Sequence, residues 1–191
     1  MLYKNDRTSL FIDGPNLFAA TRGLEIDTDY RKLLVYFRER CQLIRANYYT
    51  PIYHGQGDSP LRAIMNWLDY NGYRVVTQSS REYFNEGKRK VKGNMEIGLV
   101  VDALEASEHL DHIVLFSGNG DYLPMVTALQ RKGKIVSVVS TMQSVPPIVS
   151  DELRRHADNF IELDDLREHI HREWEDEPDS DTRQAYDPED E

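Results

Sequence analysis

Short apolar runs alternate along this chain with longer segments whose apolar residues recur every three or four positions. The runs predict strands at 8–13, 45–53, 73–78, 112–117, 134–140 and 159–163. The segments between them predict helices at 15–22, 30–41, 60–71, 94–107, 122–132, 151–156 and 165–174. Strands separated by helices are typical of βαβ units, so we expect an α/β fold with a mainly parallel central sheet.

Several of these boundaries have their own local signals. Gly72 and Gly133 lie where predicted helices end, and glycine suits the left-handed position just past a helix. Asp29 and the Ser59-Pro60 pair are typical helix starts. The pattern and the boundary residues therefore predict the same elements.

Polar side chains follow two of the apolar strands directly. The first strand runs into Asp13, with Asn16 three residues further on, and the strand at 112–117 runs into Asn119 and Asp121. Ligands of open α/β sheets bind outside the carboxyl ends of the strands, so these groups are expected to converge there. Carboxylate and amide oxygens are ligands that Mg²⁺ or Mn²⁺ prefers. Two structural alternatives stay open: Asp13 caps the next helix, and Asn119 belongs to an ordinary turn before a helix capped by Asp121.

The predicted helix at 94–107 contributes two more acids. Glu96 lies in its first turn, where a negative charge is also favoured by the helix dipole alone. Asp102 follows six residues later, about 240° around the helix, so the two carboxylates do not bind one ion from a straight helix. We predict Glu96 as the member of the metal site and Asp102 as a supporting or structural acid of the pocket.

A basic cluster precedes this helix and is interleaved with the aromatic residues Tyr83 and Phe84. Its members are Arg81, Lys88, Arg89, Lys90 and Lys92. Cations next to aromatic rings suit a single-stranded nucleic acid, because they offer phosphate contacts and a stacking surface. The alternative is a solvated surface loop, which is what most charge runs are.

The acidic balance of the chain comes from its end. The chain has 191 residues, of which 40% are hydrophobic and 29% charged, and its formal net charge is −10. Residues 173–191 contain ten acids and one arginine, so residues 1–172 have a net charge of only −1. We predict one domain over 1–172, whose neutral balance is compatible with nucleic acid, and a disordered acidic tail over 173–191.

The remaining sequence features indicate a cytoplasmic protein. Cys41 stands alone, so no intrachain disulfide can form, and a reducing cytosol is the natural setting. No apolar run approaches the roughly 20 residues that span a bilayer, and no signal-peptide core is visible at the start. We expect no membrane partner. The sequence leaves the oligomeric state open, a homo-oligomer included.

Three ordered blocks resemble the NYN domain family, and more closely its bacterial LabA-like branch, which is related to the PIN-domain nucleases. The blocks are FIDGPNL at 11–17, KGNMEI at 92–97 with VDAL at 101–104, and FSGNGDY at 116–122. The segments DELR at 151–154 and ADNFI at 157–161 also resemble that branch. The resemblance covers about residues 6–163, and several blocks in order are far more specific than one motif.

The resemblance implies a three-layer Rossmann-like, PIN-like fold with an acidic pocket that binds Mg²⁺ or Mn²⁺ and cleaves RNA. By position, it assigns Asp13, Glu96 and Asp121 as catalytic and metal-binding acids, and Asn119 as a further metal ligand. Asn16 and Ser117 would be polar groups of the same pocket, beside the Asp102 considered above.

This chain departs from the family pattern at two positions. Glu96 and Asn119 stand where the family usually has Asp. Glu96 keeps the negative charge. Asn119 keeps a carbonyl oxygen but lacks the charge, so the site attracts a divalent ion less strongly.

Two functions therefore remain: a metal-dependent ribonuclease, and a catalytically weakened RNA-binding or regulatory module of the same fold. A phosphatase of the Asp-x-Asp type would need an acid at position 15, where Pro15 stands.

Overall fold

The computed structural model describes residues 2–53, 60–85, 88–92 and 95–173. Its strands are β1 (Arg7–Asp13), β2 (Gln42–Tyr53), β3 (Tyr73–Asn85), β4 (Lys88–Lys92), β5 (His112–Phe116), β6 (Ile135–Ser140) and β7 (Asn159–Glu162). Its helices are α1 (Gly14–Gly23), α2 (Tyr30–Arg40), α3 (Pro60–Tyr70), α4 (Met95–Ala106), α5 (Leu123–Arg131), α6 (Asp151–His156) and α7 (Arg167–Ile170). Short 3₁₀ turns lie at Ser107–His109, Gly120–Tyr122 and Leu163–Leu166.

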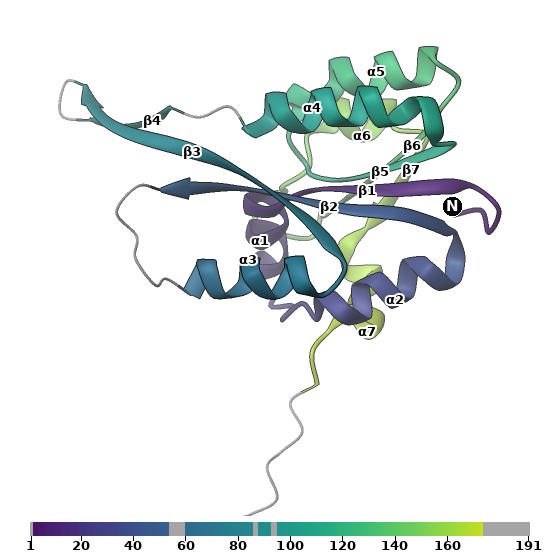
Figure 1. Cartoon of the computed structure of the whole chain (residues 1–191), viewed down its shortest axis with the longest axis horizontal. Coiled ribbons are helices and arrows are strands. Elements are labelled where there is room, and N and C mark those ends of the chain that lie inside the picture. Colours follow the sequence, from purple (N-terminus) through teal and green to yellow (C-terminus); the bar gives the residue numbers. More distant parts are fainter. Residues whose placement is uncertain (1, 54–59, 86–87, 93–94, 174–191) are drawn as a thin grey trace, which may run out of the picture.

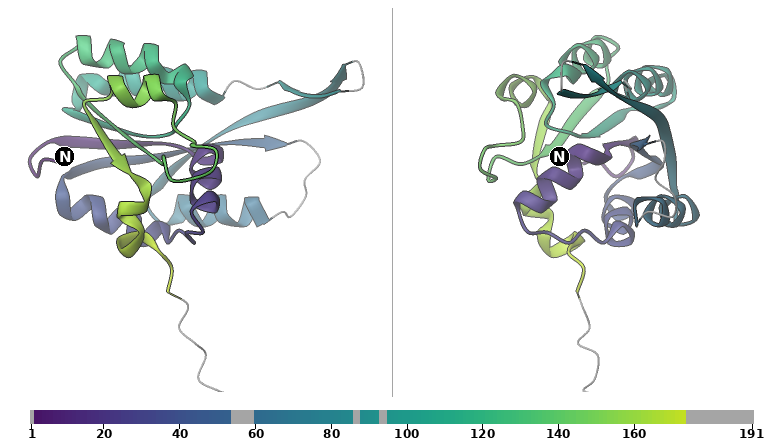
Figure 2. Two further views of the ribbon diagram at one scale, coloured as in Figure 1. Left: turned by 180° about the vertical axis from the view of Figure 1, so that it is seen from behind. Right: turned by 90° about the vertical axis from the view of Figure 1, so that its left-hand side faces the viewer.

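The strands form one sheet in the order β4-β3-β2-β1-β5-β6-β7. All neighbouring pairs are parallel except β3 and β4, which pair antiparallel. Helices α1, α2, α3 and α7 cover one face of the sheet, and α4, α5 and α6 cover the other (Figure 1). The view along the strands shows these three layers (Figure 2). The prediction of a three-layer α/β fold with a mainly parallel sheet is confirmed.

The core lies on both faces of the central strands, because successive side chains of a strand point to opposite faces. Leu10 and Ile12 of β1 pack toward α1 and α2, whereas Phe11 packs toward α4 and α5. All three are fully buried. A strand covered on both sides in this way reads as a continuous apolar run, which is why the sequence located β1 and β5.

The predicted boundary residues behave as expected where the structure describes them. Asp29 caps α2 by accepting hydrogen bonds from the backbone N–H groups of Arg31 and Lys32. Gly72 and Gly133 have φ angles of 94° and 74°, in the left-handed region that glycine tolerates. Ser59 lies outside the described residues.

Two predicted segments differ from the structure. The strand predicted at 73–78 continues to Asn85 and pairs with β4, so the stretch considered as a basic loop forms a hairpin that extends beyond the rest of the sheet (Figure 1). The helix predicted to run from 165 to 174 ends at Ile170, because His171 is extended and pairs with Thr28. Position 174 lies outside the described residues.

Within the described part of the chain, no helix has the length and apolar character that crossing a membrane requires.

Candidate functional site

The candidate site lies where β1 and β5 end side by side. From β1 the chain builds the sheet outward through β2 and β3, and from β5 it builds outward in the opposite direction through β6 and β7. The junction of β1 and β5 is therefore the topological switch point, where open α/β sheets leave a crevice for ligands. Ile12 pairs with Phe116 in the register, so Asp13 and Ser117 follow at the same level.

Asp13 is only 5% exposed and accepts hydrogen bonds on both carboxylate oxygens. Its Oδ1 accepts from the backbone N–H of Asn16 at 3.2 Å, which caps α1. Its Oδ2 accepts from the Ser117 hydroxyl at 3.2 Å and from the Tyr122 hydroxyl at 3.2 Å. The capping role that the sequence offered for Asp13 is confirmed, and the same carboxylate also faces the end of β5 through Ser117.

The electrostatics around Asp13 disfavour its negative charge. Burial raises the pKa of Asp13, and the nearby charge of Glu96 raises it further, while the three hydrogen bonds lower it in part. Burial also raises the pKa of Tyr122, as do the charges of Asp13 and Glu96. The first turn of α4, which contains Glu96, lies at the end of the sheet where β1 ends (Figure 1).

The loop after β5 is tied to α1 and to itself. The Asn16 side-chain oxygen accepts from the backbone N–H of Gly118 at 2.8 Å, which joins α1 to this loop. Ser117 donates to Asp13 and also accepts from the backbone N–H of Asn119 at 3.1 Å. Ser117 is buried and Asn16 half-buried, and both contact Asp13 at the carboxyl ends of β1 and β5.

Asn119 and Asp121 lie at the outer rim of this loop. The side-chain oxygen of Asn119 accepts from the backbone N–H of Asp121 at 3.0 Å and caps the 3₁₀ turn at Gly120–Tyr122. Asp121 is exposed. The cap is therefore Asn119, and not Asp121 as the structural alternative supposed. One lone pair of the Asn119 oxygen is engaged in the turn.

The glycines of this loop serve close packing. Neither Gly118 nor Gly120 adopts a positive φ angle. A Cβ atom at Gly118 would lie 2.5 Å from the carbonyl oxygen of Ile148, and one at Gly120 would lie 2.9 Å from the Ser150 hydroxyl. The segment before α6 therefore packs tightly against this loop, and only glycine leaves room for it.

Asp102 lies apart from Asp13 and Glu96 and acts as a structural acid. Its Oδ2 accepts from the Tyr49 hydroxyl at 2.9 Å and forms an ion pair with Arg74 at 3.1 Å. It lines a separate hollow between β2 and the end of α4. The physical reason is the one that the helical spacing gives, since six residues turn a side chain well away from Glu96. Its assignment to the pocket is corrected accordingly.

The chemistry of the donors fits a hard divalent cation, with fewer acids than predicted. Among the side chains that the structure describes, no group of three His, Cys, Asp or Glu residues could hold a metal ion. Mg²⁺ is commonly bound through one or two carboxylates and keeps waters and substrate phosphates as further ligands. Asp13 and Glu96 match that smaller requirement, with Asn119 and Asp121 at the rim.

The predicted RNA-binding cations are placed by their backbone only. Arg81 lies on β3 and pairs with Lys92 of β4, in the hairpin that also contains Lys88, Arg89 and Lys90. The side chains of these five residues lie outside what the structure describes, so their role stays a prediction.

Sequence reasoning missed the tyrosines of the site. Tyr122 was expected only as the first residue of a helix, yet its hydroxyl holds Asp13. Tyr49 pairs with Asp13 in the β1–β2 register and binds Asp102, and Tyr48 packs on the other face of the sheet. The adjacent pair Tyr48-Tyr49 in the middle of a predicted strand was the available signal, because successive residues of a strand place one side chain on each side of the sheet.

Comparisons with known proteins agree with this architecture. The family model described as the NYN domain matches residues 7–164. The low amplitude and bright protein LabA of Synechococcus elongatus is 33% identical over 183 residues, which are 93% of this chain and 95% of that protein. A crystal structure of a protein of unknown function from Vibrio parahaemolyticus superposes with a TM-score of 0.68 at 22% identity, and covers 86% of this chain and 96% of that one.

Proposed function

The chain belongs to the NYN domain family, whose fold is of the PIN-like nuclease type, and from that premise we propose that it is a metal-dependent ribonuclease. The observation that supports this most is the buried carboxylate of Asp13 at the switch point, held by two hydroxyls and acted on by the like charge of Glu96. A buried carboxyl with a raised pKa at the crevice of an open sheet is typical of functional sites.

Each residue of the proposed site has a separate role. Asp13 and Glu96 hold the cation, and a bound Mg²⁺ or Mn²⁺ supplies charge neutralisation at the phosphate and an activated water. Ser117, Tyr122 and the Asn16 backbone fix the orientation of the Asp13 carboxylate, so it needs no reorganisation when substrate arrives. Asn119 and Asp121 face the open rim, where an RNA phosphate would enter.

Cleavage of a labelled single-stranded RNA by the purified protein tests this proposal. We expect turnover with Mn²⁺ or Mg²⁺, no turnover with EDTA, and a loss of about 100-fold or more in Asp13→Asn, since even outer partners of metal ligands cost 10- to 100-fold. Cleavage that persists in both Asp13→Asn and EDTA would contradict the proposal. RNA binding without cleavage under any divalent cation would leave only the RNA-binding module.

Asn119→Asp measures what the amide costs this site. The substitution restores one negative charge at the rim, so calorimetric titration should show tighter binding of Mn²⁺ than in the wild type. The new side chain can still accept from the backbone N–H of Asp121, so the turn is kept. Equal affinity in both proteins would exclude position 119 from the metal site.

A further inference from the structure

An apolar hollow opens at the start of α1, beside the two residues that follow Asp13 in the chain. It has a volume of about 470 Å³ and lies between the start of α1, the end of β2 and the start of α3. Gly14 and Pro15, the two residues after Asp13, form one wall, and Tyr48 and Thr50 of β2 form another.

The floor of this hollow is rigid and aromatic. Tyr48 packs so closely on Gly14 that a Cβ atom there would lie 2.7 Å from its ring. Tyr30 meets Tyr48 edge-on, with ring centroids 5.7 Å apart and hydroxyl oxygens 3.4 Å apart. The hollow is thus preformed and mostly apolar, with a few convergent hydroxyls, as small-ligand sites are.

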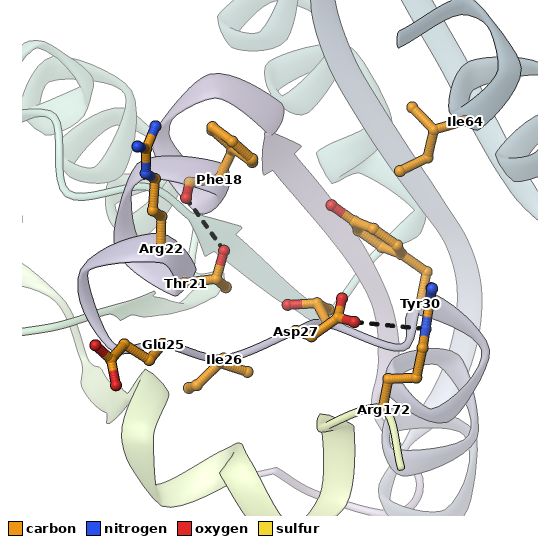
Figure 3. Close-up of a pocket in the computed structure, with 10 residues that line it drawn as sticks. Phe18, Thr21, Arg22, Glu25, Ile26, Asp27, Tyr30, Ile64 and Arg172 are labelled. Carbon is orange, nitrogen blue, oxygen red and sulfur yellow. Dashed lines mark hydrogen bonds and ion pairs between the residues drawn. The ribbon is translucent and has the colours of Figure 1, made fainter. Parts of the chain in front are cut away.

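Phe18 stands at the open side of the hollow and is 61% exposed. It also lines a second hollow of about 500 Å³, which shares Tyr30 and Ile64 with the first (Figure 3). Arg22, one helical turn after Phe18 on α1, lines that second hollow and is exposed. From the start of α1 onward, the chain therefore presents Asp13, the apolar hollow, the ring of Phe18 and the guanidinium of Arg22 in that order.

The charges of the second hollow favour its α1 side for an anion. Asp27 lies 4.0 Å from the Arg172 guanidinium, whereas Glu25 lies on the other side of the hollow, below Arg22 in the view of Figure 3. Asp27 is thus paired with Arg172, and a phosphate in this hollow would be attracted toward the exposed Arg22 of α1.

We propose that the hollow at the start of α1 holds an unpaired nucleobase of the RNA, with Phe18 as its stacking face and Arg22 beside the following phosphate. This inference rests on the proposed function and gives it a substrate feature, namely single-stranded RNA with an accessible base next to the scissile phosphate. Base–aromatic stacking is tolerant of sequence because every base has a π face, so the hollow selects for an unpaired base and not for a particular one.

Equilibrium binding in EDTA tests the proposal without cleavage. The probes are a fluorescent RNA hexamer and a hexamer of the same length whose sugars carry no bases. Phe18→Ala should bind the base-bearing hexamer about 10-fold more weakly and leave the affinity for the abasic one unchanged. Val35→Ala is the matched control, because Val35 is 46% exposed on α2 and lines a different hollow. Arg22→Ala should weaken both probes and reduce the salt dependence of binding.

The outcomes separate this inference from the proposed function. Base-dependent binding that Phe18→Ala removes, in a protein that never cleaves RNA, would support the hollow and overturn the nuclease. Cleavage by a protein whose affinity is the same for both hexamers, or is unchanged in Phe18→Ala, would overturn the hollow and keep the nuclease. A Phe18→Ala variant that changes self-association in sedimentation, with unchanged RNA affinity, would overturn it in favour of a second copy of the chain.

Discussion

The two ends of the β1–β5 pair hold acids in opposite electrostatic states. At the carboxyl end, Asp13 is buried, its donors are an amide and two hydroxyls, and its pKa is raised, chiefly by burial. At the amino end, Asp111 accepts from the backbone N–H of Arg7 at 3.0 Å and from its guanidinium at 2.9 and 3.0 Å. These hydrogen bonds lower the pKa of Asp111 to about 2.

The difference separates an acid that is paired within the chain from the acid of the proposed site. Asp111 has its cation already, so its charge is matched within the chain and it closes the start of β5 onto β1. Asp13 is buried and its donors are a backbone amide and two hydroxyls, so in the proposed function a cation from outside balances its charge. The proposal therefore assigns stability to the amino ends of these two strands and function to their carboxyl ends.

The largest expected effect comes from exchanging each acid for its amide. Asp13→Asn should abolish RNA cleavage and raise the midpoint of thermal unfolding at pH 7. The pKa of Asp13 is higher in the folded chain than its unfolded value of about 3.8, so the protonated carboxyl contributes stability at low pH. That contribution is lost as the pH rises through the folded pKa. Replacing the carboxyl with a neutral amide should therefore stabilise the fold at pH 7. Cleavage rates and thermal melts of the same samples provide both readouts.

Asp111→Asn is the matched control and should show the reverse. Cleavage is kept, and stability falls slightly at pH 7, because exposed ion pairs contribute little. The wild type should lose the same stability as the pH falls from about 4 toward 2, because Asp111 is then protonated and its ion pair with Arg7 is broken. A destabilised Asp13→Asn, or an inactive Asp111→Asn, would break the distinction between the two edges.

Smaller effects are expected from removing one hydroxyl at each end of the strands: Tyr122 should affect activity, and Ser137 should affect stability. Tyr122→Phe removes a donor to Asp13, so cleavage should fall about 10-fold and the carboxyl pKa of Asp13, followed by NMR, should rise further. Ser137→Ala, at the amino edge, should cost about 1–3 kcal/mol of stability and keep the cleavage rate. Its hydroxyl is fully buried and lies 2.7 Å from His112 Nε2 and 3.2 Å from Asn159 Nδ2.

Unchanged activity and unchanged Asp13 pKa in Tyr122→Phe would show that the tyrosine only fills space. An inactive but stable Ser137→Ala would extend the functional region to the amino edge.

The smallest effect concerns the pH dependence of stability at the amino edge. His112 is fully buried, and burial lowers its pKa below the usual 6.5. The unfolded chain then takes up a proton near pH 6.5 while the folded chain does not, so stability should decline as the pH falls below about 6.5 toward the folded pKa. His112→Asn should flatten this slope in denaturant melts between pH 7 and 5. His109→Asn, at an exposed position, is the control; a slope that disappears in His109→Asn instead would assign the proton elsewhere.

Much of the fold follows from local patterns, because strands buried on both faces read as continuous apolar runs. The run before Asp13 and the run at 112–116 located β1 and β5, and the rule for open sheets placed their ends at a binding crevice. Tyr122 could not be found in this way, since its bond to Asp13 spans 109 positions and depends on which strands are neighbours. The same holds for Asp102 of α4, whose partner Arg74 lies on β3.

The hairpin of β3 and β4 was missed for another reason. Its residues are rich in charge, and charge masks the alternation by which strands are recognised, so the segment was considered as a loop.

The most direct test of the account is the carboxyl pKa of Asp13, measured by ¹³C NMR in the wild type and in Glu96→Gln, each with and without Mg²⁺. The central claim is that Asp13 and Glu96 form a like-charged pair that receives a divalent cation. It predicts that Glu96→Gln lowers the pKa of Asp13 in the absence of metal, and that Mg²⁺ lowers it strongly in the wild type but less in the variant. A pKa of Asp13 that responds neither to Glu96→Gln nor to Mg²⁺ would contradict it.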